Sequence, residues 1–294
     1  MLVGFAGLGR MGRPMARHLA GAGHQVLAYD PAVPAGTAPA DLRDAGVEVT
    51  DDLTRLADTE VSMSMLPDAA ATESLLFGER GLVGRCGPAH VHVVMGTVGP
   101  GAVRALADKT RAMGVQLIDA PVSGSVSNAE AGTITAMVGA PPDVFDRVQP
   151  VLAAMTRAQF NTGPVGSGSA AKLAVNLVLA ALNQGVAEGL LVATADGLDP
   201  AVFYDVLESS AVAAPYVSYK REAFLSPETA GVAFPLSLLL KDVGLGLELA
   251  RQHDVDLPVA ATVGRGLEAA RDAGLDDRDM AEVLYQLRHH QEER

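Results

Sequence analysis

Over about the first 160 residues, short runs of β-branched and apolar residues alternate with segments of helical periodicity. Helices are expected where apolar residues recur every three or four positions, at 11–23, 71–78 and 101–114. Strands that alternate with helices form a mostly parallel sheet with helices on both faces, so the fold class predicted for this half is α/β. The predicted strands are 2–7, 25–30, 47–49, 61–66, 91–95, 115–120 and 133–138.

The pattern changes near residue 165, where the β-branched runs end. Helical segments follow, separated by turns that contain glycine or proline, such as "GLDP" and "SPETAG". The first of these helices, predicted over 167–196, has no proline and is apolar nearly all round, which indicates burial between other elements. A chain of 294 residues is also longer than a single hydrophobic core usually organises. We therefore predict two domains, residues 1–163 and 164–294, of which the second is all-α.

Charge and composition limit the class of partner. The chain has 22 lysine and arginine residues against 35 aspartate and glutamate residues, a formal net charge of −13. This charge disfavours nucleic acid and anionic membrane surfaces, so a small-molecule partner is expected. Cys86 is the only cysteine, and the histidines lack metal-ligand spacing, so no metal site is predicted. Because no signal-peptide pattern or long uninterrupted apolar run occurs, we expect a cytoplasmic protein with no membrane partner.

The segment "GLGRMG" lies between the first predicted strand and the first predicted helix. In this context the G-x-G-x-x-G spacing is typical of a turn that binds the pyrophosphate of a dinucleotide. The first glycine permits the tight turn, the second lets the backbone approach the phosphates, and the third allows close helix packing. The helix N-terminus adds unpaired N–H groups. The predicted cofactor-binding residues of this turn are Gly7, Leu8, Gly9, Arg10, Met11 and Gly12.

A carboxylate, Asp30, ends the second predicted strand, 18 residues after Gly12. Near this interval a carboxylate accepts hydrogen bonds from the ribose hydroxyl groups of NAD, whereas it would repel the 2′-phosphate of NADP. Pro31 stands where an arginine could have paired with that phosphate. The predicted cofactor is therefore NAD in preference to NADP.

Lys172 and Asn176 are four residues apart near the start of the long predicted helix, so both can face one ligand. Hydride reduction of a carbonyl group creates alkoxide character, and a nearby ammonium group can donate a proton as that charge develops. In the oxidative direction the same amine accepts a proton, which favours a pKa below its usual value of about 10.4. Lys172 is thus predicted to be the general acid/base, and Asn176 to bind the substrate.

Ser123 and Gly124 follow Pro121 in a predicted loop after a strand. A hydroxyl group and successive backbone N–H groups can form an anion-binding concavity there. The ligand expected in this concavity is the carboxylate of the substrate. Ser125, the next residue, adds a second hydroxyl group and is predicted to contact the substrate as well.

Four motifs occur in order: the Gly-rich turn, "DAPVSG" at 119–124, "GPVGSGSAAKLAVN" at 163–176 and "LLLKD" at 238–242. With these motifs the chain resembles the β-hydroxyacid dehydrogenase family over almost its whole length. The resemblance implies an N-terminal Rossmann domain with a doubly wound sheet, joined by a long helix to an all-α C-terminal domain. It also implies an active site between the domains, and assembly as a homodimer or homotetramer.

The resemblance also implies roles for individual residues. The lysine and asparagine of the family fall on Lys172 and Asn176, and its substrate loop falls on Ser123, Gly124 and Ser125. The resemblance also implies cofactor-binding residues near the nicotinamide end. They are Met65, Leu66, Pro67, Thr97, Phe234 and Lys241.

The chain departs from the family at the end of the fifth predicted strand. Members commonly carry Asp-x-Ser-Thr there, whereas this chain has Val94 and Gly96 at the aspartate and serine positions and keeps Thr97. Loss of the serine side chain is expected to leave more room near the substrate. A substrate bulkier or less hydroxylated than a simple 3-hydroxy acid would follow. Ser125 replaces a glycine common in the family, and its hydroxyl group can partly compensate.

The predicted function is NAD-dependent interconversion of a small 3-hydroxy carboxylic acid and its aldehyde or ketone. Two alternatives stay open, an imine reductase-like activity and a non-catalytic dinucleotide-binding protein. Imine reductases generally have aspartate or tyrosine in place of Lys172, and a non-catalytic descendant has no chemical need for a buried amine. Decarboxylation of the 6-phosphogluconate dehydrogenase type is disfavoured, because Val175 replaces the histidine that it uses.

Overall fold

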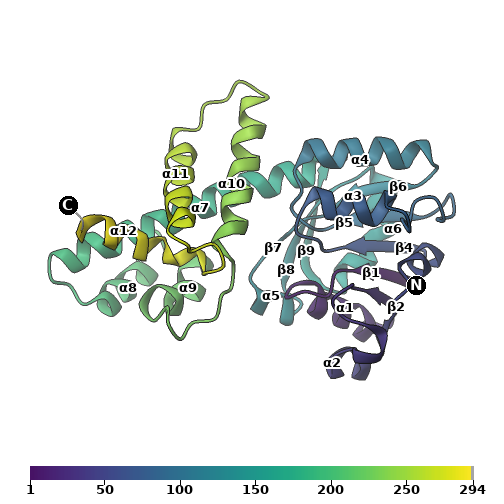
Figure 1. The fold of residues 1–294 in the computed structure, drawn as a ribbon, viewed down its shortest axis with the longest axis horizontal. Helices are drawn as coiled ribbons and strands as arrows, with labels where there is room; N and C mark the ends of the chain where they lie inside the picture. Colours follow the sequence, from purple (N-terminus) through teal and green to yellow (C-terminus); the bar gives the residue numbers. More distant parts are fainter. Residues whose placement is uncertain (293–294) are drawn as a thin grey trace. The chain divides into compact units, whose positions relative to one another are not determined.

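The computed structural model describes residues 1–292, with side chains as far as His289; residues 293 and 294 of the predicted second domain lie outside it. The chain divides into two compact units, Met1–Lys172 and Leu173–Arg294. The division falls inside helix α7 (Ser167–Ala195), which is labelled in Figure 1. This helix carries both Lys172 and Asn176.

The first unit is built on a nine-stranded sheet in the order β3-β2-β1-β4-β5-β6-β8-β7, with β9 paired to β8. β1 to β6 pair in parallel, whereas β8 is antiparallel to β6 and β7. From β1 the sheet extends to β2 on one side and to β4 on the other, which is the topological switch point where Rossmann folds bind ligands. The strands are β1 Leu2–Ala6, β2 Gln25–Tyr29, β3 Glu48–Val49, β4 Val61–Ser64, β5 Val91–Val94, β6 Gln116–Asp119, β7 Val122–Ser123, β8 Ile134–Gly139 and β9 Thr156–Gly163.

Helices cover both faces of this sheet (Figure 1). Alternate strand residues enter separate apolar clusters: Val93 and Ile118 join one cluster, and Val94 and Leu117 join the other. All seven predicted strands, and the α/β class, are therefore confirmed. The helices of this unit are α1 Gly12–Gly21, α2 Ala40–Asp44, α3 Ala69–Phe77, α4 Pro100–Ala112, α5 Val126–Glu130 and α6 Pro142–Ala153, with 3-10 turns η1 Ala35–Thr37 and η2 Leu53–Asp58.

His92 of β5, and His90 directly before that strand, are buried beside two serines of β4. His90 Nε2 and His92 Nδ1 each lie 2.7 Å from Ser62 Oγ, and His92 Nε2 lies 3.0 Å from Ser64 Oγ. His90 Nδ1 lies 2.8 Å from the carbonyl oxygen of Thr59. Burial lowers the pKa of His92 from 6.5 to about 3, and burial also lowers the pKa of His90. This His–Ser ladder therefore joins β4 to β5 through neutral imidazole rings.

Acid is expected to destabilise the protein through His92. Between its usual pKa of 6.5 and its folded pKa of about 3, the unfolded chain binds a proton that the folded chain does not, so stability falls as the pH falls. At pH 5 the loss is on the order of 2 kcal/mol. Urea unfolding of the wild type and His92→Val between pH 7.5 and 5 measures this loss. The variant should lose less stability over that range, and equal slopes would contradict the role given to His92.

The second unit contains only helices among its described residues, as predicted. One face of α7, with Val186 and Leu190, packs into an apolar core together with residues of α9, α10 and α11, such as Leu239 and Leu267. The helices are α8 Pro200–Ser209, α9 Pro215–Leu225, α10 Leu236–Arg251, α11 Pro258–Asp272 and α12 Val283–Glu292, with a 3-10 turn η3 Met280–Glu282 before α12.

The prediction that α7 is buried all round is wrong within the single chain. Val178 and Val192, four turns apart on the outward face, are 70% and 73% exposed, because the other helices of this unit pack on the opposite face. By length and composition alone α7 could also cross a membrane. Core helices of globular proteins meet the same test, so this is weak evidence for a membrane span.

Candidate functional site

The three glycines of the turn between β1 and α1 are accounted for in different ways. Gly7 has φ +96°, and a Cβ atom there would lie 2.5 Å from the carbonyl oxygen of Met65. A Cβ atom on Gly12 would overlap the carbonyl oxygen of Gly7. The fold itself therefore requires these two glycines. Gly9 is exposed, with no atom within 4 Å of a Cβ atom built there, so close approach of a ligand to its backbone best accounts for it.

The N-terminus of α1 offers its backbone amides to an anion. Its N-cap residue, Met11, makes no side-chain capping hydrogen bond, and the first turn has no acidic residue. Leu8 is buried, whereas Arg10 is exposed beside the open Gly9. An uncapped helix start after an open glycine fits the pyrophosphate of a dinucleotide, because the amides and the helix dipole both favour negative charge.

Asp30 follows β2 directly and contacts the Gly-rich turn. Its Oδ2 accepts a hydrogen bond from the backbone N–H of Leu8 at 2.7 Å, and its Oδ1 accepts one from Ala32 at 2.8 Å. Asp30 therefore shapes the turn, a role that the sequence did not reveal. Each carboxylate oxygen accepts more than one hydrogen bond, so both can still accept ribose hydroxyl groups.

The segment Met65–Pro67 continues β4 beside the Gly-rich turn. The N–H of Met65 donates to Ala6 O at 2.8 Å, which holds the segment against the end of β1. On the other side the N–H of Met95 donates to Ser64 O at 2.8 Å, so the end of β5 lies next to it. Thr97 follows that end and is half-buried. The structure thus brings the predicted nicotinamide-side segment to the same sheet edge as the Gly-rich turn.

The predicted extra room at Gly96 is not there. Gly96 is buried, and a Cβ atom on it would overlap the carbonyl oxygen of Leu66 and lie 3.3 Å from the nitrogen of Leu66. The backbone of Leu66 occupies the space where a serine side chain would begin. The expectation of a bulkier substrate therefore loses its basis, because the missing side chain has been replaced by backbone.

The residues predicted to bind the substrate carboxylate lie at the end of β7 and the start of α5. Ser123 is half-buried, and Gly124 is exposed with φ +142°. Ser125 is the N-cap of α5: its Oγ accepts from the N–H of Asn128 at 3.3 Å and donates to Asn128 Oδ1 at 2.7 Å. The S-x-x-N spacing could have indicated this capping box. The hydroxyl group of Ser125 therefore has a structural role in addition to the predicted contact.

Asp119, the first residue of "DAPVSG", anchors the start of α7. Its side chain is fully buried, and its two oxygens accept hydrogen bonds from the N–H groups of Gly166 at 2.7 Å and Ser169 at 2.6 Å. Desolvation raises the pKa of this carboxyl group, and the two amides oppose that rise. Lys172 follows Ser169 by three residues, so Asp119 helps to set where that amine begins. The sequence did not reveal this contact.

Lys172 and Asn176 lie on one face of α7, the first half-buried and the second 1% exposed. Asn176 Nδ2 donates to Asp242 Oδ2 at 2.5 Å. Because a carboxylate only accepts hydrogen bonds, the amide oxygen of Asn176 must point away from Asp242. This buried oxygen has no hydrogen-bond partner among residues 1–292. The helix face of Lys172 therefore presents an unsatisfied acceptor to a ligand.

Asp242 also contacts Lys241, whose Nζ lies 3.3 Å from Asp242 Oδ1. Asp242 is 2% exposed, so it is not the exposed charge that a helix surface pair would give. In the second unit the structure thus brings the predicted residues Asn176 and Lys241 to one buried carboxylate, which the sequence did not single out.

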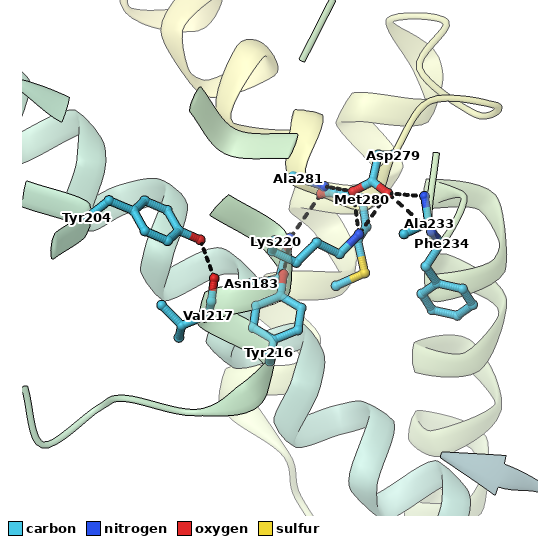
Figure 2. A network of polar contacts seen from close by, with 10 residues as sticks. All are labelled: Asn183, Tyr204, Tyr216, Val217, Lys220, Ala233, Phe234, Asp279, Met280 and Ala281. Carbon is cyan, nitrogen blue, oxygen red and sulfur yellow. Dashed lines mark hydrogen bonds and ion pairs between the residues drawn. The ribbon is translucent and has the colours of Figure 1, made fainter. Parts of the chain in front are cut away.

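Phe234, predicted to lie near the cofactor, is held through its backbone by Asp279 (Figure 2). Asp279 Oδ2 accepts from the N–H groups of Ala233 at 2.8 Å and Phe234 at 3.1 Å, and Oδ1 accepts from Ala281 at 3.0 Å. Lys220 Nζ donates to both oxygens, at 2.6 and 2.7 Å. Lys220 is 1% exposed and Asp279 5%. This buried ion pair joins α9, the segment before α10 and η3.

No group of three or more His, Cys, Asp or Glu side chains is placed to hold a metal ion within the described part of the chain. The groups that the site does contain suit a dinucleotide and a small polar substrate: open backbone amides, an amine, hydroxyl groups and an amide oxygen.

Comparison with known proteins identifies the family. The model described as the NAD binding domain of 6-phosphogluconate dehydrogenase matches residues 2–163. The model described as NAD-binding of NADP-dependent 3-hydroxyisobutyrate dehydrogenase matches residues 166–287. The chain belongs to the β-hydroxyacid dehydrogenase family. This member of the family therefore contains NAD(P)-binding domains.

Curated relatives and solved structures agree with this family. The chain is 35% identical over 293 residues to the 3-hydroxyisobutyrate dehydrogenase of Pseudomonas aeruginosa, covering 96% of each chain. It is 32% identical over 283 residues to the 2-(hydroxymethyl)glutarate dehydrogenase of Eubacterium barkeri, covering 96% of this chain and 93% of that one. Its fold matches Mycobacterium tuberculosis 3-hydroxyisobutyrate dehydrogenase with L-serine at TM-score 0.84 and 28% identity, covering 98% and 99%. The predicted Rossmann and helical fold is confirmed.

Proposed function

We propose that this β-hydroxyacid dehydrogenase uses NAD to interconvert a small 3-hydroxy carboxylic acid and its aldehyde or ketone. The observation that carries the proposal is that the half-buried Lys172 and the buried, unsatisfied amide oxygen of Asn176 occur on one face of α7. The named relatives, which act on hydroxy acids of this type, support the choice of substrate class.

Each residue has a role in the oxidative direction. Ser123, Gly124 and Ser125 bind the carboxylate of the substrate, and the amide oxygen of Asn176 accepts a hydrogen bond from the reacting hydroxyl group. Lys172 takes the hydroxyl proton as the carbonyl bond forms, and it returns that proton to the oxygen in the reductive direction. NAD, when bound, accepts the hydride. Lys241 adds positive charge beside the site, and Asp242 fixes which end of Asn176 faces the substrate.

The cofactor lies along the carboxyl edge of the first unit in this proposal. The Gly-rich turn from Gly7 to Gly12 binds the pyrophosphate, and Asp30 binds the adenosine ribose. Met65–Pro67 and Thr97 lie on the nicotinamide side. Phe234 is a further proposed cofactor contact, taken from the family resemblance.

The domain and assembly predictions remain part of the same proposal. Residues 1–163 bind the dinucleotide, and residues 164–294 carry substrate-binding groups and the contacts between copies in a homodimer or homotetramer. The exposed valines Val178 and Val192 on α7 support such contacts, since monomers rarely leave apolar helix faces uncovered. A cytoplasmic location also remains a proposal.

The experiment that tests this function is a substrate panel with purified protein. The absorbance of the reduced cofactor is followed with NAD or NADP and with small 3-hydroxy acids, 2-hydroxy acids and 3-hydroxy amides. We expect turnover of 3-hydroxy acids that have a free carboxylate, and little turnover of the amides. Dinucleotide binding without turnover of any hydroxy acid or aldehyde would instead favour a non-catalytic binding protein.

Replacing Asp30 with alanine is expected to raise the Kd for NAD roughly tenfold, because hydrogen bonds to a charged acceptor are lost. The preference for NAD over NADP should shrink, since repulsion of the 2′-phosphate disappears. The matched control is Asp30→Asn, which removes the charge but keeps one oxygen for the N–H of Leu8. Titration with reduced NAD and NADP, followed by cofactor fluorescence, measures both constants. An unchanged NAD to NADP ratio in both variants would mean that Asp30 does not contact the ribose.

A further inference from the structure

Gly96 lies where the backbone continuing β4 meets the end of β5, and it differs from the serine common in the family. We propose that Gly96 is a positioning residue. Because it has no side chain, the backbone of Leu66 packs directly against the end of β5, and this contact fixes the position of Met65–Pro67. Under the proposed function this segment faces the nicotinamide side of the cofactor, so the inference rests on that function for its effect on binding.

The first support is that the Met65–Leu66 backbone, which continues β4, lies between two glycines that follow the strands on either side of β4. On the β1 side, a Cβ atom on Gly7 would lie 2.5 Å from the carbonyl oxygen of Met65. On the β5 side, a Cβ atom on Gly96 would overlap the carbonyl oxygen of Leu66 and lie 3.2 Å from its carbonyl carbon. Both obstacles are backbone atoms, which cannot rotate away as the end of a flexible side chain can. Any side chain at position 96 must therefore displace the peptide of Leu66.

The second support is that the two strands cannot slide to make room. Ser64 pairs with Val94 in the parallel register, and the N–H of Met95 donates to Ser64 O at 2.8 Å. Below this point, the buried ladder of His92 with Ser62 and Ser64 joins the same strands through side chains. The backbone ladder and the side-chain ladder fix β4 against β5 directly before Leu66. The displacement caused by a side chain at Gly96 must then fall on Met65–Pro67.

Replacing Gly96 with the serine common in the family should consequently weaken dinucleotide binding by this chain. Serine and alanine share the Cβ atom that meets Leu66, so the serine hydroxyl group would gain nothing over the alanine methyl group. At position 96 this chain lacks the hydroxyl donor of the serine, but its backbone packs more closely against Leu66. This packing explains how Met65–Pro67 can stay fixed without the serine.

The experiment compares Gly96→Ser and Gly96→Ala with the control Gly101→Ala. Gly101 lies in α4, near position 96 in the chain, and a Cβ atom built there has no atom within 4 Å. Titration of reduced dinucleotide by fluorescence gives Kd, and kcat and KM are measured on the best substrate of the panel. Both Gly96 variants should bind the dinucleotide roughly tenfold or more weakly than the wild type, by similar factors. Gly101→Ala should bind as the wild type does.

Two outcomes would overturn the proposal: wild-type affinity in Gly96→Ala, or turnover in Gly96→Ser well above that of Gly96→Ala. Hydrogen exchange of wild-type Met65, whose N–H is bonded to Ala6 O, supplies a test that needs no variant. Slow exchange without cofactor supports a fixed segment, and exchange at the rate of an open loop contradicts it. If the wild type bound no dinucleotide, the proposed function would fail. The exchange result would still test whether Met65–Pro67 is held fixed.

Discussion

Replacing Lys172 with alanine is expected to lower kcat for oxidation of the 3-hydroxy acid by roughly 10³-fold, the middle of the range for a lost general acid/base. The reaction removes a proton from the hydroxyl group while hydride leaves the adjacent carbon, and the amine on α7 is the group that accepts it in our proposal. The Kd for reduced dinucleotide should stay within about twofold, because the contacts to the pyrophosphate come from the Gly-rich turn. Steady-state kinetics and fluorescence titration measure the two effects separately.

Two further variants make the role of Lys172 specific. Lys172→Arg keeps a cation but cannot release its proton at ordinary pH, so it should not restore oxidation. Lys109→Ala is the matched control, because Lys109 is an exposed lysine paired with Glu73 on the surface. In the wild type, oxidation should rise with pH as the amine loses its proton, and the Lys172 variants should lack that dependence. Lys172→Ala with wild-type kcat on the true substrate would remove the basis of the enzyme assignment.

The sequence predicts this fold well where the pattern of apolar residues is local. The buried strands are short runs rich in apolar residues, so all seven predicted strands were found. Strand β9 (Thr156–Gly163) was missed because it is polar and largely exposed, and β7 because two residues carry no period. Helix α7 begins at the predicted residue, Ser167, but its apolar sequence could not tell which face is covered.

The candidate site divides in the same way. The Gly-rich turn and the spacing of Lys172 and Asn176 are local, and they could be read directly from the sequence. Contacts between distant residues could not: Asn176 and Asp242 are 66 positions apart, and no periodicity links them. The error at Gly96 has another cause. A missing side chain was taken to leave space, yet glycine also lets backbone approach, and here the backbone of Leu66 fills that space.

The largest effect on stability is expected for Asp279→Ala, which should lower the free energy of unfolding of the second unit by about 3–5 kcal/mol. Lys220, 1% exposed, would lose the carboxylate that both stabilises its charge and accepts its hydrogen bonds. The N–H groups of Ala233, Phe234 and Ala281 would lose their acceptor as well. The chain has no tryptophan and five tyrosines, of which only Tyr29 lies in the first unit. Denaturant unfolding followed by tyrosine fluorescence therefore reports mainly on the second unit.

Lys220→Met is the informative partner variant, since it removes the charge while keeping most of the apolar stem. Asp279 would then still accept three backbone hydrogen bonds, so the loss should be smaller, about 1–3 kcal/mol. The double variant should be more stable than Asp279→Ala alone, because a buried cation without its carboxylate is worse than no cation. If Asp279→Ala cost no more than Lys220→Met, or if the double variant recovered nothing, the buried charge would not be the cause.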